Sequence, residues 1–208
     1  YPTHRLDITS TGDSKYDLTW IGHAQDGTDG TALSDYDLVG SCSRGTGVFA
    51  LQQAEHFDLL YLPPCGKDTE TGPAAILAAE LLCRHRAAML LVDPAAAWET
   101  ASAAVDGIRA LGYASPNMVS YFPRVHARGD KDAVARVAGA AFAGLLCKRD
   151  RNFGPWQSLD HDSLGLTRKL KPVHEFGEED AYVLQRAGIN TVQAFDGGRA
   201  YISGSGTL

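Results

Sequence analysis

One acidic residue, Asp93, follows a buried-type apolar run directly before Pro94. Open α/β sheets bind ligands outside the carboxyl ends of their strands, so a carboxylate there could hold a ligand or move a proton. An Asp-Pro pair also ends a strand and starts a helix through ordinary turn chemistry. The second interpretation is the more common one. An enzyme or small-ligand site near Asp93 stays as the alternative.

Two strings come close to catalytic or phosphate-binding motifs without matching them. Gly45-Thr46-Gly47 precedes an expected helix, but Ala50 stands where G-x-G-x-x-G needs its third glycine. A Lys-Ser or Lys-Thr pair, which a P-loop requires, does not follow. A serine nucleophile needs a G-x-S-x-G or subtilase-like G-T-S context, and Gly204-Ser205-Gly206-Thr207 gives neither. We therefore expect no catalytic residue and no cofactor-binding residue.

The densest group of metal-ligating side chains is Asp160-His161-Asp162. The seven histidines are dispersed over His4, His23, His56, His85, His126, His161 and His174. A metal site would gather such groups on one helical face or in one tight loop, so a solvated turn is favoured at His161 and no metal is expected. The neighbouring Ser158 and Ser163 are interpreted as loop residues. Arg128-Gly129-Asp130 spells an adhesion tripeptide, which short strings produce by chance.

Aromatic and sulfur-containing residues give weaker signals. Trp98, Trp156 and the Tyr121-Phe122 pair could form a ligand platform, but aromatics beside strand ends are more often core or interface anchors. Trp156 is of a type usually buried. The four cysteines, Cys42, Cys65, Cys83 and Cys147, contain no C-x-x-C pair. Scattered single thiols suit a reducing compartment, where a buried Cys acts as a small apolar residue.

Composition excludes several classes of protein. The 208 residues are 44% hydrophobic and 21% charged, with a formal net charge of −6. Nucleic-acid binding needs a clustered positive face, and the one short basic run, 148–151, contains Asp150. No apolar run reaches about 18 residues, so no membrane insertion is expected. The sequence shows no signal-peptide pattern.

Hydrophobic periodicity and turn residues define the elements that would carry these groups. Helices are predicted over 48–56, 71–86, 98–111, 133–146 and 178–187. Strands are predicted over 16–21, 37–39, 57–62, 87–92, 118–122, 191–195 and 199–203. Apolar strands that alternate with helices indicate an α/β fold. The expected central sheet is largely parallel or mixed, is covered by helices on both faces, and ends in a C-terminal antiparallel hairpin.

The polar composition of residues 1–35 sets them apart from residues 36–208. We expect the first segment to be an arm or the end of a preceding domain, and the second to be the α/β domain. The sequence begins at Tyr1 and stops just after a strand-like run, which indicates a fragment of a longer protein.

Six segments in register carry a family resemblance. They are 47–64 (GVFALQQAEHFDLLYLPP), 83–94 (CRHRAAMLLVDP), 120–125 (SYFPRV), 138–156, 188–190 (GIN) and 204–208 (GSGTL). In this order they resemble the tail sheath proteins of contractile phages and related injection particles, whose core domain has a subtilisin-like fold. Two departures concern the subfamily. Gln157-Ser158-Leu159-Asp160 replaces a common Pro-Ala-Asn segment, and Gly206 replaces an Arg.

The resemblance implies a structural subunit and no enzyme. Such subunits associate with themselves in rings, polymerise helically around an inner tail tube, and contract to drive the tube through a cell envelope. Baseplate and tail terminator proteins are the further partners implied. The implied location is a virion tail, assembled in the bacterial host cytoplasm, of a phage, prophage or phage-derived particle. Family members pair terminal arms with neighbours by strand addition.

Two expectations complete this interpretation. The arm and the C-terminal sheath domain expected after Leu208 are absent from this sequence, so we expect the 208-residue chain alone not to form long tubes. Another virion structural protein with the same fold is a third possibility, beside the sheath subunit and the enzyme.

Overall fold

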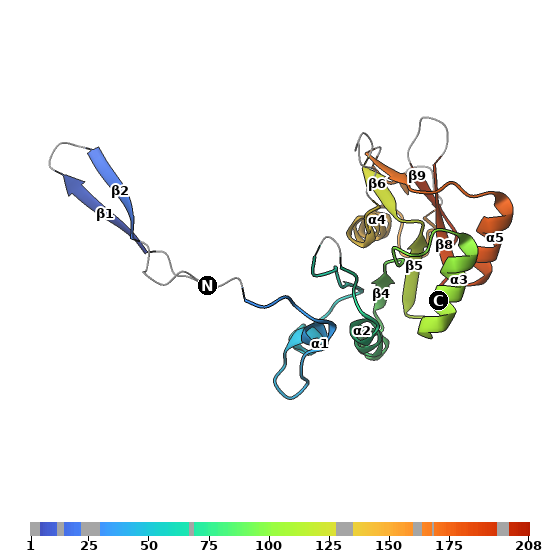
Figure 1. Cartoon of the computed structure of the whole chain (residues 1–208), viewed down its shortest axis with the longest axis horizontal. Coiled ribbons are helices and arrows are strands. Elements are labelled where there is room, and N and C mark those ends of the chain that lie inside the picture. Colours follow the sequence, from blue (N-terminus) through green and yellow to red (C-terminus); the bar gives the residue numbers. More distant parts are fainter. Residues whose placement is uncertain are drawn as a thin grey trace. The chain divides into compact units, whose positions relative to one another are not determined.

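The structure is a computed structural model of the chain, shown in Figure 1. It describes residues 5–11, 15–21, 30–66, 69–127, 135–159, 164–167, 169–194 and 200–208. The chain divides into two compact units, Tyr1–Leu33 and Ser34–Leu208. The role expected for residues 1–35, as an arm or a preceding domain, stays a prediction.

The first unit is a two-stranded antiparallel hairpin. Strand β1 (Arg5–Thr11) pairs with β2 (Lys15–Ile21) over seven residues each, from Arg5 opposite Ile21 to Thr11 opposite Lys15. The sequence predicted only the second strand. The first contains just two apolar residues, so its alternation gives a weak signal.

The second unit is built around a five-stranded mixed sheet. Its strands are β3 (Leu59–Tyr61), β4 (Met89–Val92), β5 (Met118–Phe122), β8 (Ile189–Ala194) and β9 (Ala200–Ser203), in the order β3-β4-β5-β8-β9. The first four are parallel, and β9 pairs antiparallel with β8. The predicted α/β class, with a mixed sheet and a closing hairpin, is confirmed. The tip of that hairpin, 195–199, lies outside the described residues.

A second, smaller sheet was not predicted. Strand β6 (Val125–Ala127) pairs antiparallel with β7 (Leu170–Pro172). Each strand has three residues, and such short segments lack the alternation that identifies a strand in sequence.

The helices of the second unit have between five and 14 residues. They are α1 (Asp35–Val39), the 3-10 helix η1 (Gly47–Gln53), α2 (Pro73–Arg86), α3 (Ala101–Leu111), α4 (Gly139–Asn152) and α5 (Glu178–Arg186). The predicted helices at 71–86, 98–111 and 178–187 are confirmed within three residues at each end. As expected, Pro73 lies in the first turn of α2, and Gly112 ends α3 in the left-handed conformation.

Two element predictions are wrong. The strand predicted at 37–39 is part of α1, because Ser34 and Asp37 form a capping box: the Ser34 N–H donates to Asp37 Oδ2 at 2.8 Å, and the Asp37 N–H donates to Ser34 Oγ at 3.4 Å. The helix predicted over 133–146 instead covers Gly139–Asn152, while 133–134 lie outside the described residues. The prediction ended too early because the charged residues 148–151 interrupt the apolar pattern, although the helix continues through them.

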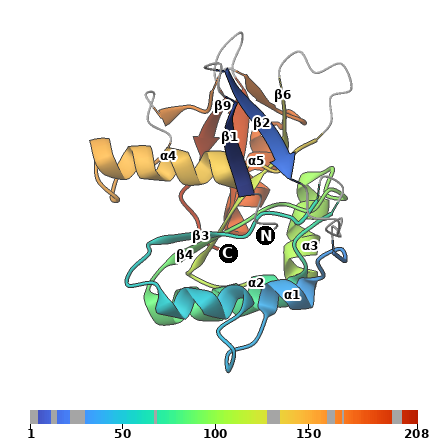
Figure 2. The ribbon, with the colours of Figure 1, turned by 90° about the vertical axis from the view of Figure 1, so that its left-hand side faces the viewer.

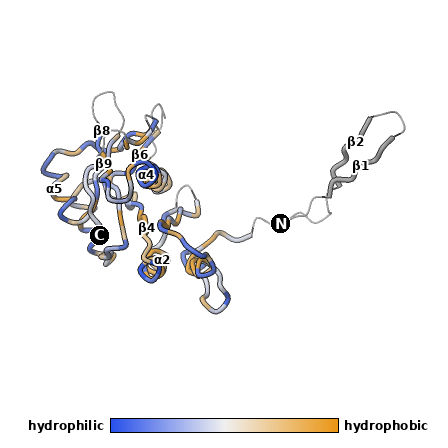
Figure 3. Tube along the Cα trace, turned by 180° about the vertical axis from the view of Figure 1, so that it is seen from behind, coloured by the Kyte–Doolittle hydropathy of each residue, from blue (hydrophilic) through white to orange (hydrophobic). Residues whose placement is uncertain are grey.

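Alternating side chains divide the core into two layers, one on each face of the sheet. Leu90 and Val92 pack with α2, α3 and α5, while Leu91 between them packs with α4. Figure 2 shows α4 and α2 on opposite sides of β3 and β4. In Figure 3, which colours the chain by hydropathy, α2 and α4 each carry both hydrophobic and hydrophilic residues. Successive strand side chains point to opposite faces, which is why uninterrupted apolar strands are buried on both sides.

Asp35 connects α1 to α2 across a long stretch of sequence. Its carboxylate accepts hydrogen bonds from the Ala74 N–H at 2.9 Å and the Ala75 N–H at 3.1 Å. The N-cap residue Gly72 has no side chain to serve this role, and a Cβ there would lie 2.3 Å from the Asp35 carboxyl carbon. The start of α2 is therefore capped by a residue of another helix.

The C-terminal segment, Gly204–Leu208, lies against the start of β8 and is called here the C-terminal strap. Asn190, 2% exposed, donates to the Gly206 carbonyl and accepts from the Gly206 N–H, both at 2.9 Å. The Leu208 N–H donates to the Met118 carbonyl at 3.0 Å. The segments 188–190 and 204–208, which the sequence analysis singled out separately, thus form one contact.

Candidate functional site

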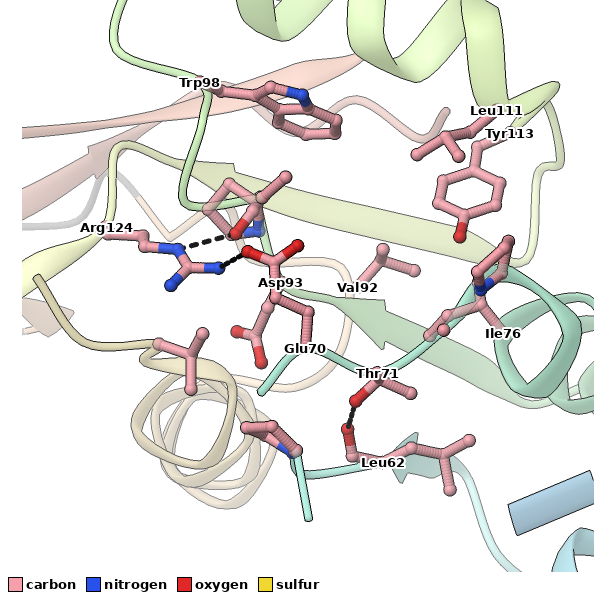
Figure 4. Close-up of a pocket in the computed structure, with 16 residues that line it drawn as sticks. Leu62, Glu70, Thr71, Ile76, Val92, Asp93, Trp98, Leu111, Tyr113 and Arg124 are labelled. Atoms are coloured by element: carbon pink, nitrogen blue, oxygen red, sulfur yellow. Dashed lines mark hydrogen bonds and ion pairs between the residues drawn. The ribbon is translucent and has the colours of Figure 1, made fainter. Parts of the chain in front are cut away.

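A hollow of about 290 Å³ lies at the carboxyl ends of β3, β4 and β5 (Figure 4). Leu62 follows β3, Asp93 follows β4 and Arg124 follows β5. The apolar part of its wall includes Leu62, Ile76, Val92, Trp98, Leu111 and Tyr113. This is the place where the sequence allowed a ligand or enzyme site near Asp93.

Both carboxylate oxygens of Asp93 accept hydrogen bonds from within the chain. The Tyr61 hydroxyl donates to Oδ2 at 2.6 Å, and the Gly139 N–H donates to Oδ1 at 3.1 Å. Burial raises the pKa of Asp93, and these donors together with Arg124 partly counteract the rise. Burial and the Asp93 contact also raise the pKa of Tyr61 far above its usual value. Asp93 therefore joins β3, β4 and the first turn of α4.

Arg124 holds the other side of the hollow. Its Nε donates to the Pro94 carbonyl at 2.7 Å, and its Nη2 pairs with Glu70 Oε1 at 2.6 Å. The Ala96 N–H donates to the same Glu70 oxygen. These bonds tie the loop after β4 to the loop before α2. They give Arg124 and one carboxylate oxygen of Glu70 partners within the chain.

This hollow differs from the usual small-molecule site of an α/β protein in two respects. Its volume of about 290 Å³ lies just below the range of roughly 300–1,000 Å³ found for small-molecule sites. The described sheet also has no topological switch point, because its parallel strands follow one another in chain order. The geometry accounts for Asp93, Glu70 and Arg124 as groups that hold strand ends and loops together.

The loop that resembled a phosphate cradle has a conformational role. Gly45 and Gly47 have φ of 60° and 63°, and η1 begins at Gly47. A Cβ on Gly47 would lie 2.5 Å from the Leu38 carbonyl oxygen. Its glycines therefore permit close backbone packing against the end of α1.

The hydroxyl and histidine candidates are separated or undescribed. Gly204–Thr207 lies in the C-terminal strap, and Ser158 is a half-buried loop residue. Asp160-His161-Asp162, Ser163, Arg128-Gly129-Asp130, His4 and His23 lie outside the described residues. Within the described residues, His, Cys, Asp and Glu side chains form no group of three that could bind a metal ion. None of the helices in these ranges has the length and apolar content of a membrane span.

The aromatic candidates divide into core residues and one exposed residue. Tyr121 stacks on Phe142 with centroids 4.3 Å apart, and Phe122 stacks on Phe176 at 5.3 Å. Trp98 is half-buried against the core and lies over Gly107. The expectation that Trp156 is buried is wrong, because it is 85% exposed. Gly154, at φ 91°, leaves room for its ring to lie across the backbone.

The four cysteines lie in two kinds of surroundings. Cys83 is buried in the core, where burial raises the pKa of its thiol to about 11. Cys42, Cys65 and Cys147 are exposed and form no disulfide among the described residues. Cys83 thus acts as the small apolar residue that the sequence analysis expects of a buried cysteine.

A second hollow, of about 300 Å³, lies at the opposite end of the sheet and was missed by the sequence analysis. Leu59 and Met89, the first residues of β3 and β4, line it together with Trp156 and part of the C-terminal strap. The sequence signal at this place is Trp156, a large aromatic residue at the end of the segment 138–156.

Comparisons with known proteins give a likeness of fold. No protein-family model matches the chain, and no curated protein matches its sequence. A cryo-EM structure of the anti-feeding prophage baseplate is similar with a TM-score of 0.56 and 18% identity, over 85% of this chain and 43% of the other. A cryo-EM structure of the contracted helical sheath of the anti-feeding prophage is similar with a TM-score of 0.52 and 22% identity, over 72% and 38%.

At these identities the likeness concerns the fold. The chain spans less than half the length of either of these two chains. The fold described here is therefore one that occurs within larger subunits of a phage-like particle.

Proposed function

We propose that this chain is the core of a structural subunit of a contractile tail sheath. In this role it polymerises helically around an inner tail tube and contracts to drive the tube through a cell envelope. The observation that carries the proposal is the agreement of two independent signals. Six segments in register resemble sheath proteins, and the fold resembles two parts of one phage-like particle, its baseplate and its contracted sheath.

The positions of the six segments support the proposal physically. The segment 83–94 covers the end of α2, all of β4 and Asp93. The segments 188–190 and 204–208 meet at Asn190 and the C-terminal strap. The segment 83–94 and the pair of segments 188–190 and 204–208 thus make contacts that hold the ends of the central strands in place. A subunit that changes its contacts during contraction needs a core that moves as a rigid body.

The proposed partners follow from the same role. They are further copies of the subunit, the inner tail tube protein, and baseplate and tail terminator proteins. The proposed location is the tail of a phage, prophage or phage-derived particle, assembled in the bacterial host cytoplasm. A chain in this role carries no cofactor, performs no catalysis, binds no nucleic acid and inserts in no membrane.

Negative-stain electron microscopy of the protein as its gene encodes it, expressed alone, tests the proposal. Ribbed hollow cylinders or stacks of rings are the expected result. A monomer or a small closed oligomer that persists at high concentration would overturn the sheath assignment.

A structural role in the baseplate is the second candidate. It is favoured by the greater coverage, 85% of this chain, in the similarity to the baseplate structure. Closed single rings that do not stack into cylinders in the same micrographs would favour it over the sheath. Binding of a small molecule that is lost in an Asp93→Asn variant would instead favour the enzyme or ligand-binding alternative.

A further inference from the structure

Trp156 is an exposed aromatic side chain in a defined position. It is 85% exposed, although indole has a large apolar surface. Its ring lies across Gly154, where a Cβ would come within 2.3 Å of the ring carbons. A tryptophan that is supported by backbone yet left in solvent has the properties of an interface anchor, since such residues contribute most of the binding energy at protein contacts.

The hollow at the other end of the sheet has the size and lining to receive one such ring. Its volume of about 290 Å³ suits a single large side chain better than a cofactor. Trp98 and Tyr113 are among the residues of its wall. At its rim, Glu70 has a side chain 47% exposed, so its carboxylate can accept a hydrogen bond from an indole N–H.

The ring and the hollow lie at opposite ends of the parallel strands. Trp156 shares its surroundings with Leu59 and Met89, which begin β3 and β4. The hollow is lined by Leu62 and Asp93, which follow the ends of the same strands. Within one copy the ring therefore cannot reach the hollow. A contact between them joins two different surfaces of two copies.

The formal charges near the two features have opposite sign. Residues 148–151, at the last turn of α4, contain three basic residues and one acidic, which gives +2. The hollow is lined by Glu70, Asp93 and Arg124, which gives −1. Opposite charges favour the approach of these two surfaces over the approach of like surfaces.

We propose that Trp156 of one copy inserts into the hollow at the carboxyl ends of β3, β4 and β5 of a second copy. The occupant of the hollow is thus another molecule of this chain. Each contact leaves one ring and one hollow free at its ends, so the association is heterologous and continues into an open chain. This inference rests on the proposed function, because it names a contact by which the subunits would stack.

Sedimentation velocity of the 208-residue chain, from about 10 µM to about 1 mM, tests the contact, since a contact of small area is populated in this range. Wild type should form short head-to-tail oligomers. Trp156→Ala should weaken association at least about 30-fold, a hot-spot effect of about 2 kcal/mol. Tyr182→Ala is the matched control: Tyr182 is 61% exposed on α5, and its removal should leave association unchanged.

A second variant closes the hollow. Ala95 lines it, and Ala95→Phe should fill it and abolish association while Trp156 stays intact. Mixing Ala95→Phe with Trp156→Ala then supplies one free ring and one open hollow. The mixture should form heterodimers and nothing larger, while each variant alone stays monomeric. Circular dichroism and the urea midpoint verify that both variants fold.

The outcomes separate this inference from the proposed function. A monomeric wild type at about 1 mM, or unchanged association of Trp156→Ala, would overturn the proposed contact. Failure of the heterodimer to form from two folded variants would do the same. Cylinders formed by the protein as its gene encodes it would still support the sheath role in each of these cases, with its subunits joined through other surfaces.

Discussion

Replacing Asn190 is expected to release the C-terminal strap. This side chain is almost fully buried at the second residue of β8. Its amide group makes three hydrogen bonds: with the Gly206 carbonyl and the Gly206 N–H, both at 2.9 Å, and with the Ser120 carbonyl at 3.3 Å. The amide thus joins β8 to both β5 and the strap.

The size of the effect follows from these bonds. Each contributes about 1 kcal/mol net, so Asn190→Ala should lower the free energy of unfolding by about 3 kcal/mol. Domains of this size are stable by about 5–15 kcal/mol, so the variant should still fold. Urea unfolding measures the loss. Amide hydrogen exchange should show faster exchange at Gly206 and Leu208, whose N–H groups are held at Asn190 and Met118.

Thr207→Ala provides the control, because Thr207 is exposed within the same strap. Its effect should stay within about 0.5 kcal/mol. A loss below about 1 kcal/mol for Asn190→Ala, or unchanged exchange at Gly206, would refute the idea that this side chain holds the strap.

Asn190→Asp adds a test with a pH dependence. The carboxylate keeps the acceptor for the Gly206 N–H but loses the donor that faces two carbonyls. Burial and these carbonyls would raise its pKa above the unfolded value of about 3.9. A raised Asp pKa means that stability is lost as the pH rises, so this variant should be weaker than Asn190→Ala at pH 7 and should recover toward pH 4. Equal destabilisation at both pH values would contradict this reasoning.

Three further predictions concern the core. Gly139→Ala should lower the free energy of unfolding in urea by about 2 kcal/mol or more, because its Cβ would lie 2.1 Å from the Tyr61 ring. Gly144→Ala in the same helix is the control: its Cβ would meet nothing within 4 Å, so it should raise the free energy of unfolding by about 0.5–1 kcal/mol. Burial raises the pKa of Asp93, so the contribution of this carboxyl group to stability falls as the pH rises above about 4. The free energy of unfolding of Asp93→Asn, relative to that of wild type, should therefore increase between pH 4 and 7. A difference that stays constant over this range would count against this reasoning. Ser120 Oγ has no hydrogen-bond partner among the described residues, so Ser120→Ala should raise the urea midpoint or leave it unchanged, and a loss above about 1 kcal/mol would indicate a missed partner.

Much of the fold could be predicted because the signals are local. The strand predicted at 118–122 is β5 without a change of boundary, since four of its five residues are apolar and all five are buried. Pro73 and Gly112 mark the start of α2 and the end of α3 through their own backbone preferences. The start of α1 was misread because a five-residue helix depends on its Ser34 cap more than on periodicity.

The sequence predicted where the candidate site lies, but not what its residues do. The Asp-Pro pair after β4 correctly marked the edge of the sheet where Asp93 lies. Its role depends on Tyr61 and Gly139, which are 32 and 46 residues away in sequence. No pattern near Asp93 indicates that both of its oxygens are occupied by these donors.

The sequence by itself determined the α/β class, the buried strands and most of the helices. The reason is that hydrophobic period and capping residues report burial and backbone conformation within a few residues. Only the tertiary structure decided the pairing of Asn190 with the C-terminal strap, the capping of α2 by Asp35, and the exposure of Trp156 opposite a hollow. These features depend on how the layers pack across long sequence separations, and the residue types alone leave those contacts open.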